Sequence, residues 1–104
     1  MEKLFVVPPR ILPFPTVHNL REGSQLTLPC SVTEGDLPLR FTWLYNGRPV
    51  SGVPHLTINR LGDYSSYLGI TDIMKKHSGN YTCSIENDAS NVSRTASIIV
   101  QGEL

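Results

Sequence analysis

The chain of 104 residues has neither an excess of charge nor a long apolar run. Its nine acidic side chains balance its nine basic ones, which excludes the basic footprint of a protein that binds nucleic acid or an anionic membrane surface. No stretch approaches the roughly 20 apolar residues that cross a membrane. The opening residues 1–5 are too short for a signal peptide and carry an acid where basic and then apolar residues belong. We expect any signal and anchor to lie elsewhere, in a longer protein.

The sequence also lacks the residue groupings of a catalytic or metal site. His18, His55 and His77 lie in three separate segments, and none stands at metal-ligand spacing from another ligating residue. No G-x-S-x-G motif and no glycine-rich phosphate loop is present. The aspartates are scattered, without the spacing of a calcium loop: Asp36, Asp63, Asp72 and Asp88. We therefore expect no enzymatic activity, no metal, no cofactor and no small-molecule substrate, and we expect solvated or capping roles for the histidines.

Only two cysteines and one tryptophan are present, and their spacing is informative. Trp43 follows Cys30 by thirteen positions, and Tyr81 precedes Cys83 by two. In an immunoglobulin-like sandwich, cysteines on strands B and F join opposite sheets and a strand C tryptophan packs on their disulfide. A tyrosine two residues before the second cysteine bonds back to the preceding corner. The spacing therefore predicts an all-β sandwich of two antiparallel sheets with one inter-sheet disulfide, Cys30–Cys83.

The length fits one such domain, with a core between about residues 8 and 100 and no room for a second domain. A disulfide of this kind implies an oxidising compartment. Two N-x-S/T triplets, at Asn80 and Asn91, are candidate glycosylation sites and agree with passage through the secretory route. We therefore predict a module excised from a longer extracellular protein, with a membrane-anchored parent at the cell surface.

Short alternating runs separated by turn residues predict strands, with a single helical turn between Ile73 and Gly79. Prolines interrupt residues 6–11, which suits a first strand that switches between sheets. Pro29 falls within strand B, where its missing N–H predicts either a bulge or a donor position facing an unpaired stretch. Asn46-Gly47 predicts a tight turn into a short strand. The inward positions are expected to form the core: Leu26, Leu28, Phe41, Leu56, Ile58, Leu68, Ile70, Ile85, Ile98 and Val100.

The outward positions distinguish the two sheets. Both sequon asparagines fall on the sheet that contains strands C, F and G, with Asn80 opening strand F and Asn91 near the start of G. Because glycans are bulky, they leave the face of strands A, B, E and D as the expected contact surface. Strand parity predicts small side chains around one aromatic on that face: Thr27, Pro29, Thr57, Asn59, Tyr67 and Gly69.

Several segments carry a pattern narrower than the general fold. They are Ile11-x-Pro13-Phe14, Gly35-Asp36-x-Pro38-Leu39-x-Phe41-x-Trp43, Asn46-Gly47, Ser65-Ser66-x-Leu68-x-Ile70 and His77-Ser78-Gly79-Asn80-Tyr81-Thr82-Cys83. From about Pro8 to Val100 the chain resembles the I-set immunoglobulin domains of the Down syndrome cell adhesion molecule (Dscam) family. It most resembles the arthropod variable domains of the seventh-domain type, and it is also similar to the first domain of the shortened arthropod Dscam proteins.

The resemblance implies a recognition module for cell-cell adhesion that binds an identical copy of itself in trans, with many isoforms that each prefer self. In this family, variable domains pair antiparallel through the A, B, E, D side, so the resemblance implies an antiparallel homodimer. The six outward residues above are then the homophilic interface, with Tyr67 as its anchor because aromatic groups dominate interface energetics.

Two alternatives stay open from the sequence. In the first, a heterophilic or immune-type receptor module binds a foreign ligand through its loops, and Gly35-Asp36 and residues 87–90 are the contacts. In the second, the domain is a structural spacer in a tandem array. One departure from the family pattern concerns His77, which stands where the family usually has an Asp. In the family, that Asp often pairs with an Arg at the start of strand D. We expect the fold to survive the absence of that surface ion pair.

Overall fold

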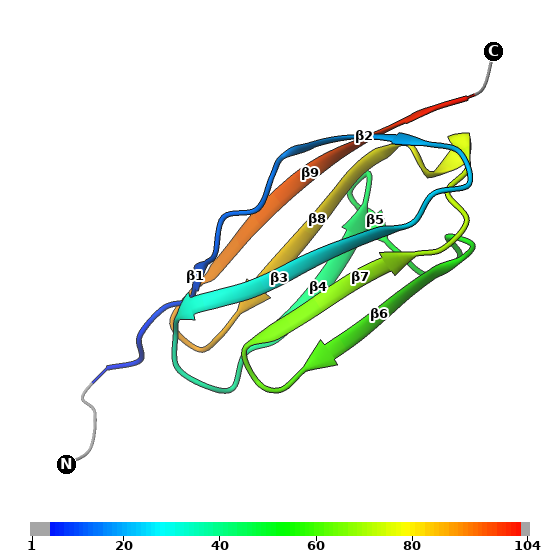
Figure 1. The fold of residues 1–104 in the computed structure, drawn as a ribbon. Helices are drawn as coiled ribbons and strands as arrows, with labels where there is room; N and C mark the ends of the chain where they lie inside the picture. The colour runs from blue at the N-terminus through cyan, green and yellow to red at the C-terminus, as the bar shows by residue number, and fades with distance from the viewer. Residues whose placement is uncertain (1–4, 103–104) are drawn as a thin grey trace.

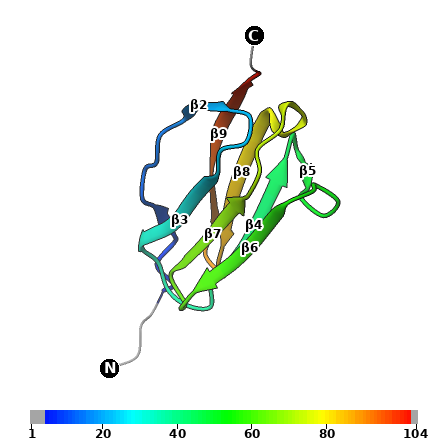
Figure 2. The ribbon, with the colours of Figure 1, turned by 45° about the vertical axis from the view of Figure 1, so that its right-hand side comes forward.

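The computed structural model describes residues 5–102; residues 1–4, most of the segment considered above as a signal peptide, and residues 103–104 lie outside the described part. Two sheets face one another (Figure 1, Figure 2). In spatial order, the first contains β1 (Arg10–Ile11), β3 (Leu26–Glu34), β7 (Ser65–Ile70) and β6 (Leu56–Leu61). The second contains β2 (Val17–Arg21), β9 (Asn91–Gln101), β8 (Gly79–Glu86), β4 (Arg40–Tyr45) and β5 (Arg48–Pro49). The predicted all-β sandwich is confirmed.

A short 3-10 turn, η1 (Lys75–His77), links β7 to β8 within the predicted helical segment. The turn between β4 and β5 is also as predicted, because Asn46 and Gly47 both have positive φ, 49° and 81°. Among residues 5–102, no helix has the length and apolar character needed to cross a membrane.

The N-terminal segment contributes a strand to each sheet. β1 pairs antiparallel with β3, and β2 pairs with β9, so the segment switches sheets as predicted; the β2–β9 pair is parallel, which the prediction of antiparallel sheets did not include. Arg94 of β9 holds the crossing between them. Its Nε and Nη2 atoms donate to the carbonyl oxygen of Phe14 at 2.9 and 2.6 Å, and its guanidinium lies 5.2 Å from the Phe14 ring centroid. This side chain therefore stabilises the proline-rich connection between the two strands.

The core lies between the sheets around the disulfide that joins Cys30 to Cys83. In the chain-entropy model, a cross-link between cysteines 53 residues apart contributes about 4 kcal/mol to stability. The buried polar groups beside it are satisfied. Trp43 Nε1–H donates to Ser66 Oγ at 3.0 Å, and the Tyr81 hydroxyl donates to the carbonyl oxygen of His77 at 2.7 Å. The tyrosine thus bonds back to the corner that precedes β8.

Pro29 sits in β3 without a bulge, since the register that places it opposite Tyr67 continues unbroken on both sides. Alternate residues of an antiparallel pair bond to the same neighbour, and Val32 N–H donates to Tyr64 O at 3.0 Å. The even-numbered residues of β3 therefore bond toward β7, and Pro29 faces the other edge. Along that edge β1 pairs only with Val32 and Glu34. Pro29 therefore stands at a donor position that faces an unpaired stretch, which is one of the two predicted explanations.

The structure corrects the burial expected for two side chains, those of Ile58 and His77. Ile58 lies opposite Leu68 on the inward side of β6, yet its side chain is 41 % exposed because β6 is the last strand of its sheet. The prediction that Ile58 belongs to the core is therefore wrong. His77 is fully buried, which excludes a solvated role. It does have the capping role, because its Nδ1 accepts a hydrogen bond from Met74 N–H at 2.8 Å at the start of η1.

Candidate functional site

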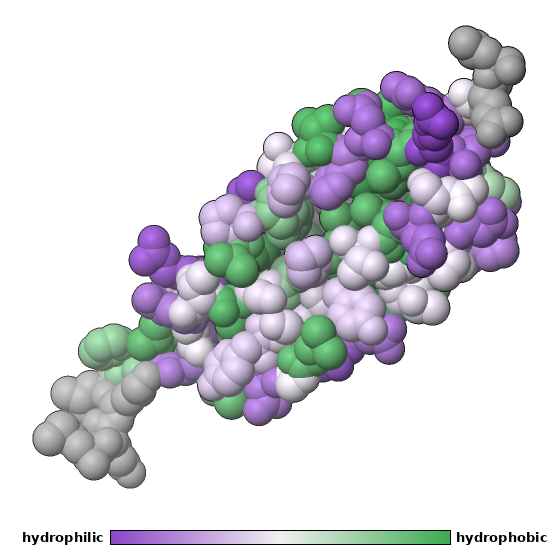
Figure 3. Space-filling model, in the orientation of Figure 1, coloured by the Kyte–Doolittle hydropathy of each residue, from purple (hydrophilic) through white to green (hydrophobic). Residues whose placement is uncertain are grey.

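The outer face of the first sheet presents a block of uncharged side chains. Thr27, Pro29, Thr57, Asn59, Tyr67 and Gly69 all lie on it, and the strand register arranges the face in three rows across β3, β7 and β6. The rows are Thr27–Gly69–Thr57, Pro29–Tyr67–Asn59 and Ser31–Ser65–Leu61. None of these nine residues is acidic, basic or histidine. We call them the uncharged face; Figure 3 views this side of the molecule, where pale residues are interspersed with hydrophobic ones.

The third row extends the six predicted residues. Leu61 is 60 % exposed, and Ser31 and Ser65 join their hydroxyls at 2.7 Å across the two strands. The signal for this row was present in the sequence, because the alternation that places Thr57 and Asn59 outward continues to Leu61. This third row was not among the predicted interface residues.

The outer face of the second sheet is different in charge. Arg40 Nε lies 3.0 Å from Glu86 Oε1, and Arg40 Nη2 lies 3.8 Å from Asp88 Oδ1, with all three side chains at least half-exposed. Asn80 is the second residue of β8 and Asn91 the first of β9, both exposed, on this same sheet. The two faces of the sandwich therefore separate an uncharged surface from a surface that carries charge and both sequons.

The loops proposed as contacts in the foreign-ligand alternative are tied to the chain's own N-terminal segment. Asn87 is buried, and its Nδ2 donates to the carbonyl oxygens of Val7 at 2.7 Å and Asp36 at 3.0 Å. Its Oδ1 accepts from the N–H groups of Ala89 and Ser90. Asn87 therefore organises this pole internally, with its side-chain amide engaged by four hydrogen bonds within the chain. From the sequence, Asn87 was predicted to be a ligand contact in a loop, and this structural role was not predicted.

The comparisons with known proteins agree with this geometry. Residues 8–87 match the family model described as immunoglobulin domain. The chain is 39 % identical over 95 residues to the cell adhesion molecule DSCAM of Homo sapiens, and 37 % identical over 100 residues to Dscam2 of Drosophila melanogaster. These matches cover 91 % and 96 % of this chain. The crystal structure of the Dscam1 Ig7 domain, isoform 5, superposes with a TM-score of 0.84 at 31 % identity, over 90 % of this chain and 97 % of that one.

The chain is an immunoglobulin domain of the Dscam family. The predicted family resemblance is thereby confirmed, including the likeness to the seventh-domain type. The chain spans 5 % of the length of the curated relatives it matches.

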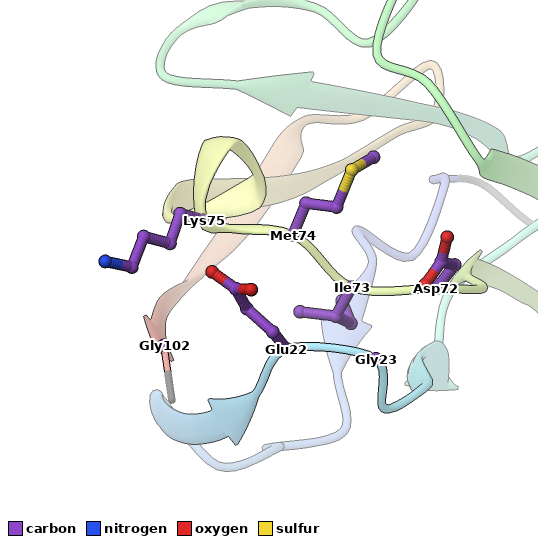
Figure 4. Close-up of a pocket in the computed structure, with 7 residues that line it drawn as sticks. All are labelled: Glu22, Gly23, Asp72, Ile73, Met74, Lys75 and Gly102. Atoms are coloured by element: carbon purple, nitrogen blue, oxygen red, sulfur yellow. The ribbon is translucent and has the colours of Figure 1, made fainter. Parts of the chain in front are cut away.

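A hollow of about 440 Å³ lies at the pole of this Dscam-family domain where β9 ends (Figure 4). The carboxylate of Glu22 points away from Asp72, toward the side of the hollow where Lys75 lies, so the two carboxylates do not form a pair. Its wall is held by backbone bonds, with Gly23 N–H donating to Ile73 O at 2.7 Å. Within residues 5–102, no three His, Cys, Asp or Glu side chains gather into a group that could hold a metal ion. The uncharged face is therefore the strongest candidate functional surface.

Proposed function

We propose that this domain mediates homophilic, isoform-specific cell-cell adhesion by pairing antiparallel with an identical copy through the uncharged face. The observation that carries the proposal is the absence of charge from all nine residues of that face, beside a second face that carries ion pairs and sequons. In a symmetric pair, each patch meets its own copy. A face without formal charge meets no like-charge repulsion in any register. The relatives' name, cell adhesion molecule, supports the same function.

Glycosylation supports this choice of face. Asn80 and Asn91 are exposed on the second sheet, and we propose that both carry glycans in an extracellular module of a longer, membrane-anchored protein. Bulky sugars there obstruct contacts through the second face and leave the uncharged face open. No catalytic role is proposed for any residue.

A single domain offers a contact of standard size or smaller, for which micromolar affinity is the expectation. Adhesion then relies on many copies acting together across the contact between two cells. Isoform specificity follows from the symmetry, since one substitution on the face appears twice in the pair. A charge placed near the axis opposes its own copy in a self pair.

Sedimentation equilibrium of the glycosylated domain across micromolar concentrations tests the proposal. We expect the wild type to pass from monomer to dimer, and Tyr67→Asp to remain monomeric because it buries a carboxylate in the interface. Leu44→Asp on β4 is the matched control, because Leu44 faces outward from the second sheet, and we expect it to dimerise as the wild type does. Circular dichroism verifies that both variants are folded.

Two other outcomes of this experiment would contradict pairing through the uncharged face. A wild type that stays monomeric excludes self-pairing and favours a foreign ligand or a spacer role. Dimerisation that survives Tyr67→Asp but is lost in Leu44→Asp moves the interface to the second sheet.

A further inference from the structure

Gly69 occupies the middle strand of the uncharged face without any structural need for glycine. Its φ lies outside the left-handed region, and a Cβ atom added there would meet Thr57 Oγ1 at 3.4 Å and Leu26 O at 3.9 Å, which are ordinary contacts. Glycine inside a strand lowers stability because of its backbone entropy and its missing side chain. A strand glycine that the fold itself does not require often marks a place where another surface approaches closely.

Gly69 presents no side chain on the face, and we call this position the hollow. Gly69 is flanked across the sheet by Thr27 on β3 and Thr57 on β6. Tyr67 is the next outward residue along the same strand, about 6.6 Å away at the usual strand rise of about 3.3 Å per residue. A bulky aromatic side chain and a position without a side chain therefore lie next to each other at the centre of the face.

We propose that the two-fold axis of the self-pair crosses β7 at Leu68, so that Tyr67 of each copy fills the hollow over the partner's Gly69. This inference rests on the proposed function and specifies its register. In an antiparallel face-to-face pair, the axis lies in the interface plane and runs across the strands. Each β7 then lies over the partner's β7 in the opposite direction, and positions at equal distances from Leu68 on either side face one another.

The flanking strands fit the same register. The row of Gly69 lies over the partner's row of Tyr67, which sets Thr57 opposite the partner's Asn59 and Thr27 opposite the partner's Pro29. The first of these contacts joins a hydroxyl with an amide, which can exchange a hydrogen bond. The second is a contact between small, uncharged groups. No contact in these two rows opposes like charges.

Neighbouring registers lack this fit. An axis at Tyr67 sets the two rings directly against each other. An axis at Gly69 sets the two hollows against each other and leaves a void at the centre, where the lining loses its packing contacts. Of these three registers, only the axis at Leu68 fills both hollows with an aromatic side chain.

Two single variants test the register when they are mixed. Tyr67→Gly has two hollows and no ring, whereas Gly69→Tyr has two rings and no hollow. Each variant alone is expected to self-associate at least about tenfold more weakly than the wild type, by loss of a packed aromatic or by overpacking. Mixed in equal amounts they are expected to recover heterodimer affinity within a few-fold of the wild type, because every ring then meets a hollow.

The readout is sedimentation velocity with one variant fluorescently labelled, after thermal unfolding has verified that each variant is folded. Ser84→Tyr, which adds the same bulk on the second sheet, is the matched control and is expected to associate as the wild type does. A wild-type dimer with no recovery in the mixture overturns the register and leaves self-pairing intact. A wild type that does not associate at all overturns the proposed function itself.

Discussion

The Nε2 atom of His77 lies 2.8 Å from the carbonyl oxygen of Pro54, just before the start of β6. Its Nδ1 accepts the N–H of Met74, so Nε2 carries the ring proton and donates to Pro54. The ring therefore links η1 to the entrance of β6 at the position where the family pattern usually has an Asp. Both ring nitrogens of His77 are hydrogen-bonded at the position where the resemblance to the family implied that the usual ion pair is absent.

His77→Asp should lower the free energy of unfolding by about 2 kcal/mol or more, because a carboxylate cannot donate to the Pro54 carbonyl in this buried site. His77→Asn retains a donor and an acceptor and should lose less. Urea unfolding followed by Trp43 fluorescence measures both variants. Equal stability of His77→Asp and the wild type would show that the bond to Pro54 contributes little.

The buried hydroxyl of Tyr81 should make the domain less stable at high pH. Burial, and secondly the neighbouring Tyr45, raises the pKa of the Tyr81 hydroxyl above its ordinary value. The folded state therefore holds this proton to higher pH than the unfolded chain. Its contribution to stability is complete below about pH 10 and is lost as the pH rises beyond that value.

In Tyr81→Phe the hydrogen bond to His77 is absent at every pH, which should cost about 1 kcal/mol at neutral pH. The difference between wild type and variant should narrow above about pH 10, and urea unfolding from pH 8 to 11 measures it. Groups that titrate in both proteins cancel in this difference. A constant gap across the whole range would contradict the raised pKa.

Asn87→Ala should destabilise the domain by about 1–3 kcal/mol, because it removes the two hydrogen bonds to the carbonyls of Val7 and Asp36 and the acceptor for the N–H groups of Ala89 and Ser90. Asn19→Ala is the matched control, since Asn19 is exposed on β2, and its effect should lie within about 0.5 kcal/mol of zero. Chemical denaturation compares the two variants. Similar losses in both would remove Asn87 as the organiser of the loops.

The sequons predict two glycans on the domain when it is secreted from a eukaryotic cell. The intact mass should fall by one glycan in Asn91→Gln and by both after enzymatic deglycosylation. Self-association should persist in Asn91→Gln, because the sugar lies on the second sheet. An unglycosylated secreted domain, or a dimer that requires the Asn91 glycan, would contradict the proposed arrangement of the faces.

Much of the fold could be predicted from alternation and from a few residues with restricted chemistry. The burial of Leu28, Leu68 and Ile85, the turn at Asn46 and the disulfide all follow from local pattern and spacing. The exposure of Ile58 could not be predicted, because periodicity identifies the inward side of a strand and not whether another strand covers it. Edge position is a property of the whole sheet.

The candidate face was also largely predictable, since parity alone places Tyr67 and Gly69 on one side of β7. Three features depended on tertiary contacts between residues far apart in sequence. Arg94 reaches Phe14, Asn87 reaches Val7, and His77 reaches Pro54. Each is a polar side chain bonded to a distant carbonyl, and no local pattern identifies such a partner.

Aggregation of coated beads measures pairing between apposed surfaces most directly. Red beads carrying the wild-type domain and green beads carrying Tyr67→Asp are mixed, each anchored through the C-terminus. Red beads should form clusters that exclude the green ones, and excess soluble wild-type domain should disperse them. Clusters that recruit green beads equally, or red beads that remain single at high coating density, would contradict homophilic adhesion through the uncharged face.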